Sequence, residues 1–201
     1  MDEEKKKKKQ KEVHDRILDA ALEAIAQHKI SGTRVRLIAD QAGISHGHLH
    51  YYFDSKKELM LDLLDNIIET FHSSREEALE NTEFEGIDRL NVFFQQKKES
   101  IIQKKIPVTL FDFWVQGTID ETIRKKMQSS YISWSADIKE LLGEAAAKGT
   151  VSKKYIDILP YLMISIMDGA AIQYILNEES FDLDSYFELS GDIIQQLLSK
   201  T

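Results

Sequence analysis

The chain has 201 residues, with 26 lysines and arginines against 34 aspartates and glutamates, which gives a formal net charge of −8. Apolar residues make up 42% and charged residues 30% of the chain, a composition typical of a soluble globular protein and too apolar for a disordered one. The chain has no cysteine, which excludes disulfides, thiolate metal sites and cysteine nucleophiles.

The charge is distributed unevenly along the chain. Residues 1–57 contain twelve Lys/Arg and nine Asp/Glu, a net charge of +3, whereas residues 58–201 contain fourteen and twenty-five, a net charge of −11. A basic head on an acidic body is typical of a nucleic-acid-binding module joined to a domain with another role. The simpler alternative is a solvated lysine tail on an ordinary acidic protein.

The N-terminus carries the lysine run Lys5–Lys9, and no apolar segment follows it, so we do not expect a secretory signal. We expect residues 1–10 to form a disordered basic arm that adds only non-specific, salt-sensitive affinity for nucleic acid. The alternative is an arm that follows the DNA backbone or enters the minor groove.

Only two prolines and nine glycines interrupt sequences rich in helix formers, which predicts an all-α protein. Apolar residues spaced three and four apart predict a first helix that stops near Lys29. Thr33 is the expected N-cap of a short second helix, with Gly43 just past its end. Ser45 is the expected N-cap of the helix His46–Tyr52, and Ser55 with Glu58 forms a predicted capping box at the start of a longer helix.

The remaining sequence predicts a helical bundle. Helices are expected over 87–102, 108–115, 118–147, 154–177 and 185–199, with Thr118 and Glu121 as a capping box and Asp184 as an N-cap. The twenty-residue segment 158–177 is mostly apolar and contains Asp168 as its only formal charge. Because a carboxylate at the centre of a bilayer is costly, we expect a buried helix of a soluble protein rather than a membrane span.

Two short helices separated by Gly43, Ile44 and Ser45 have the dimensions of a helix-turn-helix. Only Leu49 and Phe53 of the second helix share an apolar face, so its polar and aromatic residues are left facing outward, where they can meet base edges and phosphates. Basic residues near this helix are candidate phosphate contacts. They are Arg34, Arg36, Lys56 and Lys57.

The segment Thr33–Leu59 contains an Ile-Ala pair, an Ala-Gly-Ile-Ser turn, the sequence Leu-His-Tyr-Tyr-Phe and the sequence Ser-Lys-Lys-Glu-Leu. This succession resembles the DNA-binding domain of TetR-type (tetracycline-repressor family) transcriptional regulators. The resemblance implies an N-terminal three-helix helix-turn-helix domain over residues 11–57 and a C-terminal helical domain for ligand binding and dimerisation over 58–201. It also implies that Lys56 contacts a phosphate. The residues expected at DNA are Thr33, Arg34, Arg36, Ser45, His46, Gly47, His48, His50, Tyr51, Tyr52 and Lys56.

His50 stands where the family commonly has a tyrosine, and together with His46 and His48 it suggests pH-dependent operator binding, since histidine titrates near neutrality. His46 and His50 are also four residues apart and could ligate a metal. Without a nearby acidic or cysteine ligand we expect surface residues instead, and no metal site.

The resemblance to the family extends more loosely into the body, where Asp168-Gly169 and the residues after it resemble an Asp-Gly-Leu stretch of one branch. The last two helices are apolar on more than one face, which predicts a homodimer in which they pair with their copies. For the effector we expect an apolar pocket with a few polar anchors. The candidate lining residues are Phe111, Trp114, Gln116, Tyr131, Trp134, Met163, Met167, Asp168 and Tyr174. A carboxylate among aromatics, Asp112 or Asp168, would favour a lipophilic cation.

These features predict a cytoplasmic, dimeric regulator that binds a double-stranded DNA operator and is a repressor released by an unidentified small-molecule effector. One alternative is a regulator or activator without a small-molecule site, whose body serves only for dimerisation. No nucleophile–base–acid arrangement or phosphate loop is present, so we expect neither an enzyme nor a cofactor, and an all-helical hydrolase or metalloenzyme is the rival from another class.

Overall fold

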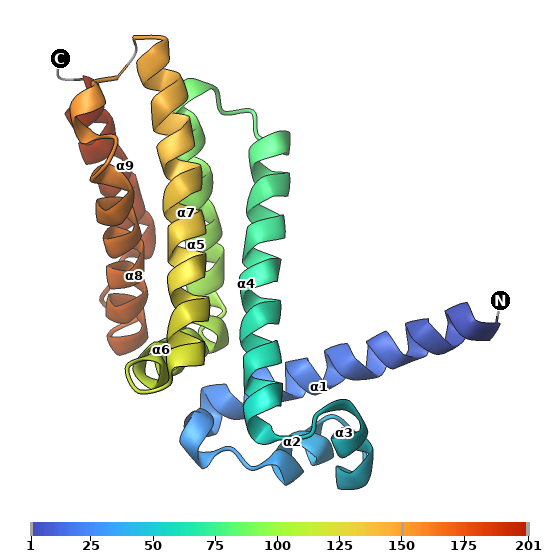
Figure 1. Ribbon diagram of the computed structural model, residues 1–201. Helices are drawn as coiled ribbons and strands as arrows, with labels where there is room; N and C mark the ends of the chain where they lie inside the picture. The colour runs from blue at the N-terminus through green and yellow to red at the C-terminus, as the bar shows by residue number, and fades with distance from the viewer. Residues whose placement is uncertain (1, 150, 200–201) are drawn as a thin grey trace. The chain divides into compact units, whose positions relative to one another are not determined.

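The computed structural model describes residues 2–149 and 151–199, and these residues form helices joined by turns (Figure 1). The predicted all-α class is therefore confirmed. The α-helices are α1 (Asp2–Gly32), α2 (Val35–Gln41), α3 (His46–Tyr52), α4 (Lys56–Asn81), α5 (Asn91–Ile102), α6 (Lys105–Gly117), α7 (Glu121–Ala147), α8 (Leu159–Leu176) and α9 (Leu183–Ser199). Two short 3-10 turns, η1 (Gly86–Leu90) and η2 (Lys153–Tyr155), precede α5 and α8.

The chain divides into two compact units. The head unit contains the residues up to Glu69 together with Lys105–Met127, and the body unit contains Thr70–Lys104 and the residues from Gln128 onward. This division does not follow the expected boundary after residue 57, because α6 packs against α1 and so belongs to the head unit. The functional boundary between DNA binding and effector binding remains a prediction.

Helix α1 differs most from its prediction. The disordered arm expected over residues 1–10 is wrong for residues 2–10, which are helical and continue into the rest of α1. Glu3 and Glu4 stand four residues before Lys7 and Lys8, which is the stabilising order for ion pairs on a helix, and lysine itself is a good helix former. At the other end, Lys29 has a φ of 63° and interrupts the helix at the predicted stop.

The turn between α2 and α3 forms as its sequence predicts. Gly43 has a φ of +67°, and its N–H and that of Ile44 donate to the carbonyls of Asp40 (3.2 Å) and Ala39 (3.0 Å). This is the Schellman ending of a helix, which favours glycine at the left-handed position. Ser45 then caps α3, since its Oγ accepts a hydrogen bond from the His48 N–H at 3.1 Å.

Four predicted N-terminal caps need correction. Arg34, not Thr33, precedes α2, and it makes no side-chain cap. Asp120 replaces Thr118 at the start of α7, where its carboxylate accepts from the N–H groups of Thr122 and Ile123.

Asp182, not Asp184, accepts from the Ser185 N–H at 3.0 Å near the start of α9. The capping box of α4 is half confirmed. The Glu58 N–H donates to Ser55 Oγ, but the Glu58 carboxylate accepts from Asp54 rather than from Ser55.

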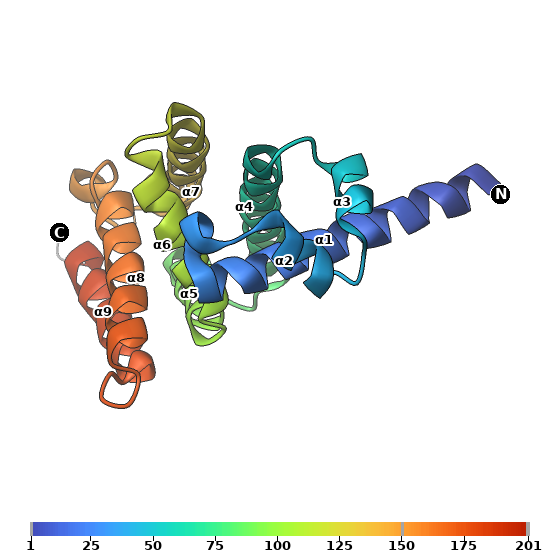
Figure 2. The same cartoon turned by 90° about the horizontal axis from the view of Figure 1, so that it is seen from below.

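Each unit has its own core. The head core joins α1, α2, α3 and α4 through fully buried side chains, with α2 and α3 lying beside α1 (Figure 2). These side chains are Ile17, Ile25, Ile38, Leu49, Leu59 and Leu63. The body core is formed by α5, α7 and α8, chiefly by Phe93, Ile101, Ile138, Leu142, Met163 and Met167.

Two predicted body helices are shorter than expected, because the segment 87–102 divides into η1 and α5, and the segment 154–177 divides into η2 and α8. Helix α8 is long and apolar enough to cross a membrane by length and composition, and 39% of this stretch is buried inside the chain. One side of α8 packs into the body core, while the other side remains exposed.

Candidate nucleic-acid interface

Helix α3 is a short helix that is fixed at both ends. Leu49 is fully buried and Phe53, directly after the helix, is also buried, so two apolar side chains hold α3 on the head core. Ser45 caps its first turn. Such anchoring leaves a seven-residue helix with a defined orientation, although a helix of this length would not be stable alone.

The outward face of α3 consists of polar and aromatic side chains. His46, Gly47, His48, His50 and Tyr51 are all exposed, and Tyr51 is 69% exposed. Tyr52 is half-buried, and the ring centroids of Tyr51 and Tyr52 lie 5.4 Å apart. The imidazole and phenol groups can donate and accept hydrogen bonds. The structure thus brings six of the expected DNA-contacting residues, counting Tyr52, onto one helix.

Two of the histidines of α3 lie side by side. The rings of His46 and His50 have centroids 4.5 Å apart in an edge-to-face arrangement. Among the residues that the structure describes, no group of three or more His, Asp or Glu side chains is placed to hold a metal ion.

The candidate phosphate contacts fall into two classes. Arg34 and Arg36 are exposed beside α2, whereas Lys56 is half-buried, and its Nζ donates to the Ile30 carbonyl. Burial lowers the pKa of Lys56, and the nearby Asp112 carboxylate partly offsets that effect. Thr33 is not a surface residue, since it is 2% exposed and its hydroxyl donates to the carbonyls of Lys29 and Ala24. Its expected side-chain contact with DNA is therefore wrong.

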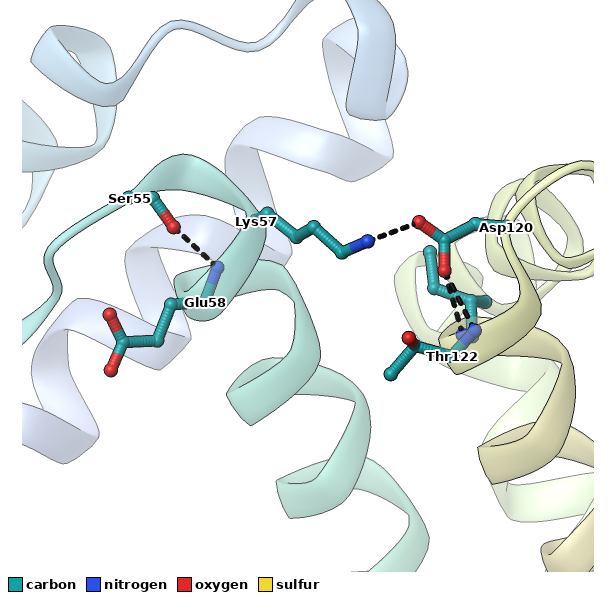
Figure 3. A network of polar contacts seen from close by, with 6 residues as sticks. Ser55, Lys57, Glu58, Asp120 and Thr122 are labelled. Atoms are coloured by element: carbon teal, nitrogen blue, oxygen red, sulfur yellow. Dashed lines mark hydrogen bonds and ion pairs between the residues drawn. The ribbon is translucent and has the colours of Figure 1, made fainter.

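Lys57 joins the starts of α4 and α7 within the head unit (Figure 3). Its Nζ lies 2.6 Å from the Asp120 carboxylate, which also accepts the two backbone hydrogen bonds that cap α7. The ion pair with Lys57 and these N–H donors hold the pKa of Asp120 below its usual value. Lys57 is thus already paired in the structure.

The backbone of Ile30 connects α1 with α6 and α4, and we call these two hydrogen bonds the Ile30 connection. Its N–H donates to the Asp112 carboxylate on α6, and its carbonyl accepts from Lys56 on α4. Ile30 follows Lys29, the left-handed residue that interrupts α1. The sequence reading missed this connection because it is made through a main-chain amide, which no side-chain pattern marks.

In the body unit, four side chains form a polar cluster, which we call the Lys97 cluster: Lys97, Tyr131, Trp134 and Asp168. Lys97 Nζ lies 2.6 Å from one oxygen of Asp168, and the Tyr131 hydroxyl donates to the other at 2.6 Å. Lys97 also lies 5.5 Å from the centroid of the Trp134 ring. Burial and the neighbouring carboxylate raise the pKa of Tyr131. Lys97 is only 11% exposed, and the sequence reading missed it because it stands among other charged residues.

The other candidate pocket residues are divided between the two units. Phe111, Trp114 and Gln116 belong to the head unit, where Trp114 is 59% exposed. Met163 and Met167 are fully buried in the body core. The Tyr174 hydroxyl donates to Glu178 at 3.0 Å.

Neither carboxylate suggested for a lipophilic cation is unpaired. Asp168 is paired with Lys97, and Asp112 accepts the hydrogen bond from Ile30. A cation bound at either carboxylate would have to displace or share that partner, and cation binding stays a prediction.

Exposed apolar side chains are concentrated on the last two helices and form what we call the α8–α9 face. It consists of Ile158, Tyr161, Leu162, Ile172, Leu176, Leu189 and Ile193. Residues 158, 162, 172 and 176 are spaced to lie on one side of α8. Several exposed apolar side chains on one side of a helix are typical of an interaction site.

Comparison with known proteins agrees with this architecture. Residues 17–63 match the family model described as "Bacterial regulatory proteins, tetR family". The chain is 24% identical over 171 residues, 80% of its length and 76% of the relative's, to "Probable HTH-type transcriptional regulator YttP" of Bacillus subtilis. It is 21% identical over 194 residues to "Fatty acid metabolism regulator protein" of the same species, covering 91% of this chain and 92% of that one.

Among solved structures, a transcriptional regulator from Saccharomonospora viridis in complex with choline has the same fold. The TM-score is 0.84 and the identity 21%, covering 94% of this chain and 98% of that chain. The family match spans the end of the first helix, α2, α3 and the start of α4, where the exposed polar face lies.

Proposed function

From the premise that the chain is a TetR-type DNA-binding transcriptional regulator, we propose that it is a cytoplasmic homodimeric repressor released from its operator by a small-molecule effector. The observation that carries the proposal is the outward face of α3. Its side chains are polar and exposed, while Leu49 and Phe53 hold the helix on the head core.

In the proposed complex, α3 enters the major groove. The histidine and tyrosine side chains hydrogen-bond to base edges, and the exposed Arg34 and Arg36 contact phosphates. Lys56 would have to leave the Ile30 carbonyl, or share its Nζ with it, to reach a phosphate. Base contacts supply specificity, whereas the arginines supply salt-sensitive affinity.

The α8–α9 face is the proposed dimer interface. Pairing with its copy across a two-fold axis would bury its leucines and isoleucines, whose exposure is costly in water. Two copies of α3 would then be related by the same axis. The operator is therefore an inverted repeat whose half-sites are about 34–36 Å apart, one turn of DNA.

The Ile30 connection is the proposed coupling element. An effector that shifts α6 would move Asp112, weaken its hydrogen bond with the Ile30 N–H and disturb the left-handed residue beside it. Because the Ile30 carbonyl accepts from Lys56, the same shift changes the position of a phosphate contact. The effector would thereby bind the DNA-free conformation more tightly than the DNA-binding conformation and shift the population toward the former.

The Lys97 cluster supplies the proposed polar anchor of the effector site. An amphipathic effector would place its polar group where it competes for Lys97 or Asp168, and its apolar part beside Trp134 and Tyr131. A relative with this fold is described in complex with choline, and another is named for fatty acid metabolism. These two chemistries define the first compounds to test.

The test is selection of the purified protein on a random-sequence DNA library, followed by release of the selected operator by choline or by palmitate. We expect an inverted repeat, and release by one class of compound. Lys97→Ala should abolish release by palmitate, whereas Asp168→Asn should abolish release by choline. Specific binding that neither class releases would favour the alternative, a regulator whose body only dimerises. Sequence-independent binding alone would contradict the proposed function. We propose no catalytic role for the chain, since its relatives are transcriptional regulators.

A further inference from the structure

The basic N-terminal turns of α1 have a fixed direction relative to the recognition helix α3. Gln10 Nε2 donates to the Tyr51 hydroxyl at 3.2 Å. One turn later, the His14 ring lies 5.4 Å from the ring of Phe53, and His14 Nε2 lies 2.7 Å from an Asp62 oxygen on α4. Two successive turns of α1 are therefore held against α3 and the residues that follow it.

Beyond Gln10, the helix continues outward through the lysine run. The residues between Asp2 and Gln10 extend it by about 12 Å, and Lys5–Lys9 are all exposed. Figure 2 shows the N-terminal end of α1 projecting beyond α3 within the head unit. Because the segment is helical, the five lysines point in different directions instead of forming one charged cloud.

Helical spacing divides the lysines into two sets. Lys6 and Lys7 stand four and three residues before Gln10 and lie on the face that contacts Tyr51. Lys5 and Lys8 lie on the opposite face. Glu3 stands seven residues before Gln10, so it lies on the same face one turn beyond Lys6 and Lys7. Its negative charge ends the basic patch on that face.

We infer that Lys6 and Lys7 form a phosphate clamp that binds the DNA backbone flanking each operator half-site. The inference rests on the proposed function, because Tyr51 is exposed on the outward face of α3 and Gln10 ties the clamp to it. The clamp extends the protein's contact with DNA beyond the base pairs that α3 reads. Full affinity therefore requires an operator with flanking DNA long enough to reach the clamp. A flexible tail would not impose this requirement.

The experiment compares two full-length double variants with equal charge loss, Lys6→Ala/Lys7→Ala and Lys5→Ala/Lys8→Ala. Alanine is the best helix former, so both variants retain the helix. Each is titrated by fluorescence anisotropy, over a range of salt, onto the selected operator with and without about one turn of flanking DNA on either side.

On the long probe, Lys6→Ala/Lys7→Ala should bind at least about tenfold more weakly, and its salt slope should fall by about 3 to 4, the value for four lost phosphate contacts per dimer. Lys5→Ala/Lys8→Ala should match the wild type, and all three proteins should agree on the short probe. Equal losses of affinity in both variants would identify a non-specific tail and overturn the clamp. No loss of affinity in either variant would also overturn the clamp. Binding of the wild type to the short probe tests the proposed function separately. Absence of sequence-specific binding to that probe would contradict both the proposed function and the clamp.

Discussion

The outward face of α3 and the α8–α9 face are both exposed in the single chain, yet their chemistry is opposite. The face of α3 carries imidazole and phenol groups beside two arginines. The α8–α9 face carries leucine, isoleucine and one tyrosine, with Leu176 77% exposed. A surface that binds the hydrated polyanion DNA is expected to be polar, whereas the proposed interface between two copies of the chain is apolar.

In the proposed function, this difference makes the two binding events depend on different interactions. DNA binding depends on charge and hydrogen bonds, so it weakens as salt rises. The proposed dimerisation depends on apolar burial, which salt does not weaken. The face of α3 can therefore be changed without affecting the proposed dimer, whereas loss of the dimer would also weaken operator binding.

The largest effect is expected from charges placed on the α8–α9 face. Leu162→Glu with Leu189→Glu removes two apolar contacts per protomer, each worth about 1.5–3 kcal/mol when buried, and introduces charges that a two-fold interface would bury. Dimerisation and operator affinity should both fall at least about 100-fold. Sedimentation velocity and anisotropy titration measure the two effects.

Ile119→Glu is the matched control for charge on an exposed apolar side chain, because Ile119 is exposed but lies outside the α8–α9 face. It should leave the dimer intact. A double variant that stays dimeric would place the interface elsewhere.

A smaller effect is expected on α3. His48→Ala with Tyr51→Ala removes two exposed donors, and each direct base contact contributes about 1–3 kcal/mol. Specific operator affinity should fall at least about 30-fold, while the dimer and the thermal unfolding temperature remain those of the wild type. Binding to random DNA should change little. Unchanged discrimination between operator and random DNA would remove α3 as the reading element.

Tyr131→Phe tests an internal hydrogen bond of the body unit and changes neither of the two surfaces. The hydroxyl donates to a carboxylate, so its loss should cost about 1–2 kcal/mol of unfolding free energy at neutral pH. The folded-state pKa of Tyr131 is raised above the ordinary value of 10.0. Its contribution is therefore fully present below pH 10 and is lost as pH rises further.

Denaturant unfolding at a series of alkaline pH values measures this contribution. The difference in unfolding free energy between wild type and Tyr131→Phe should be constant below pH 10 and should shrink above it. A difference independent of pH up to the alkaline limit would show that the hydroxyl is not bonded to Asp168.

The smallest effects come from two glycines on either side of Ser45. Gly43→Ala should destabilise the head unit by about 1 kcal/mol, because the left-handed backbone penalises a Cβ although no atom lies within 4 Å of it. Gly47→Ala should instead stabilise α3, since alanine favours a helix. Thermal unfolding measures both variants, and the same sign for both would contradict the assigned turn.

Local patterns predicted the head unit well. The span of α3, its Ser45 cap, the left-handed Gly43 and the buried Leu49 all follow from residues close together in the chain. Such features depend on hydrogen bonds within one turn or one helix, which sequence reading can find.

Features formed between distant residues were missed. The Ile30 connection joins Ile30 to Asp112, and the Lys97 cluster joins Lys97 to Asp168. The helical lysine run was also missed, because its ion-pair spacing received less weight than its charge. The pocket residues were the hardest to predict from the sequence, since aromatic composition does not show which side chains point toward one another.

The most direct test of the account is sedimentation of the protein, alone and with its selected operator, as salt is raised from about 0.05 to 0.5 M. We predict one dimer per inverted repeat, with log affinity for DNA falling linearly with log salt, while the dimer alone dissociates no more at high salt than at low. A dimer that dissociates as steeply as the DNA complex, or a monomer bound to a single half-site, would contradict the account.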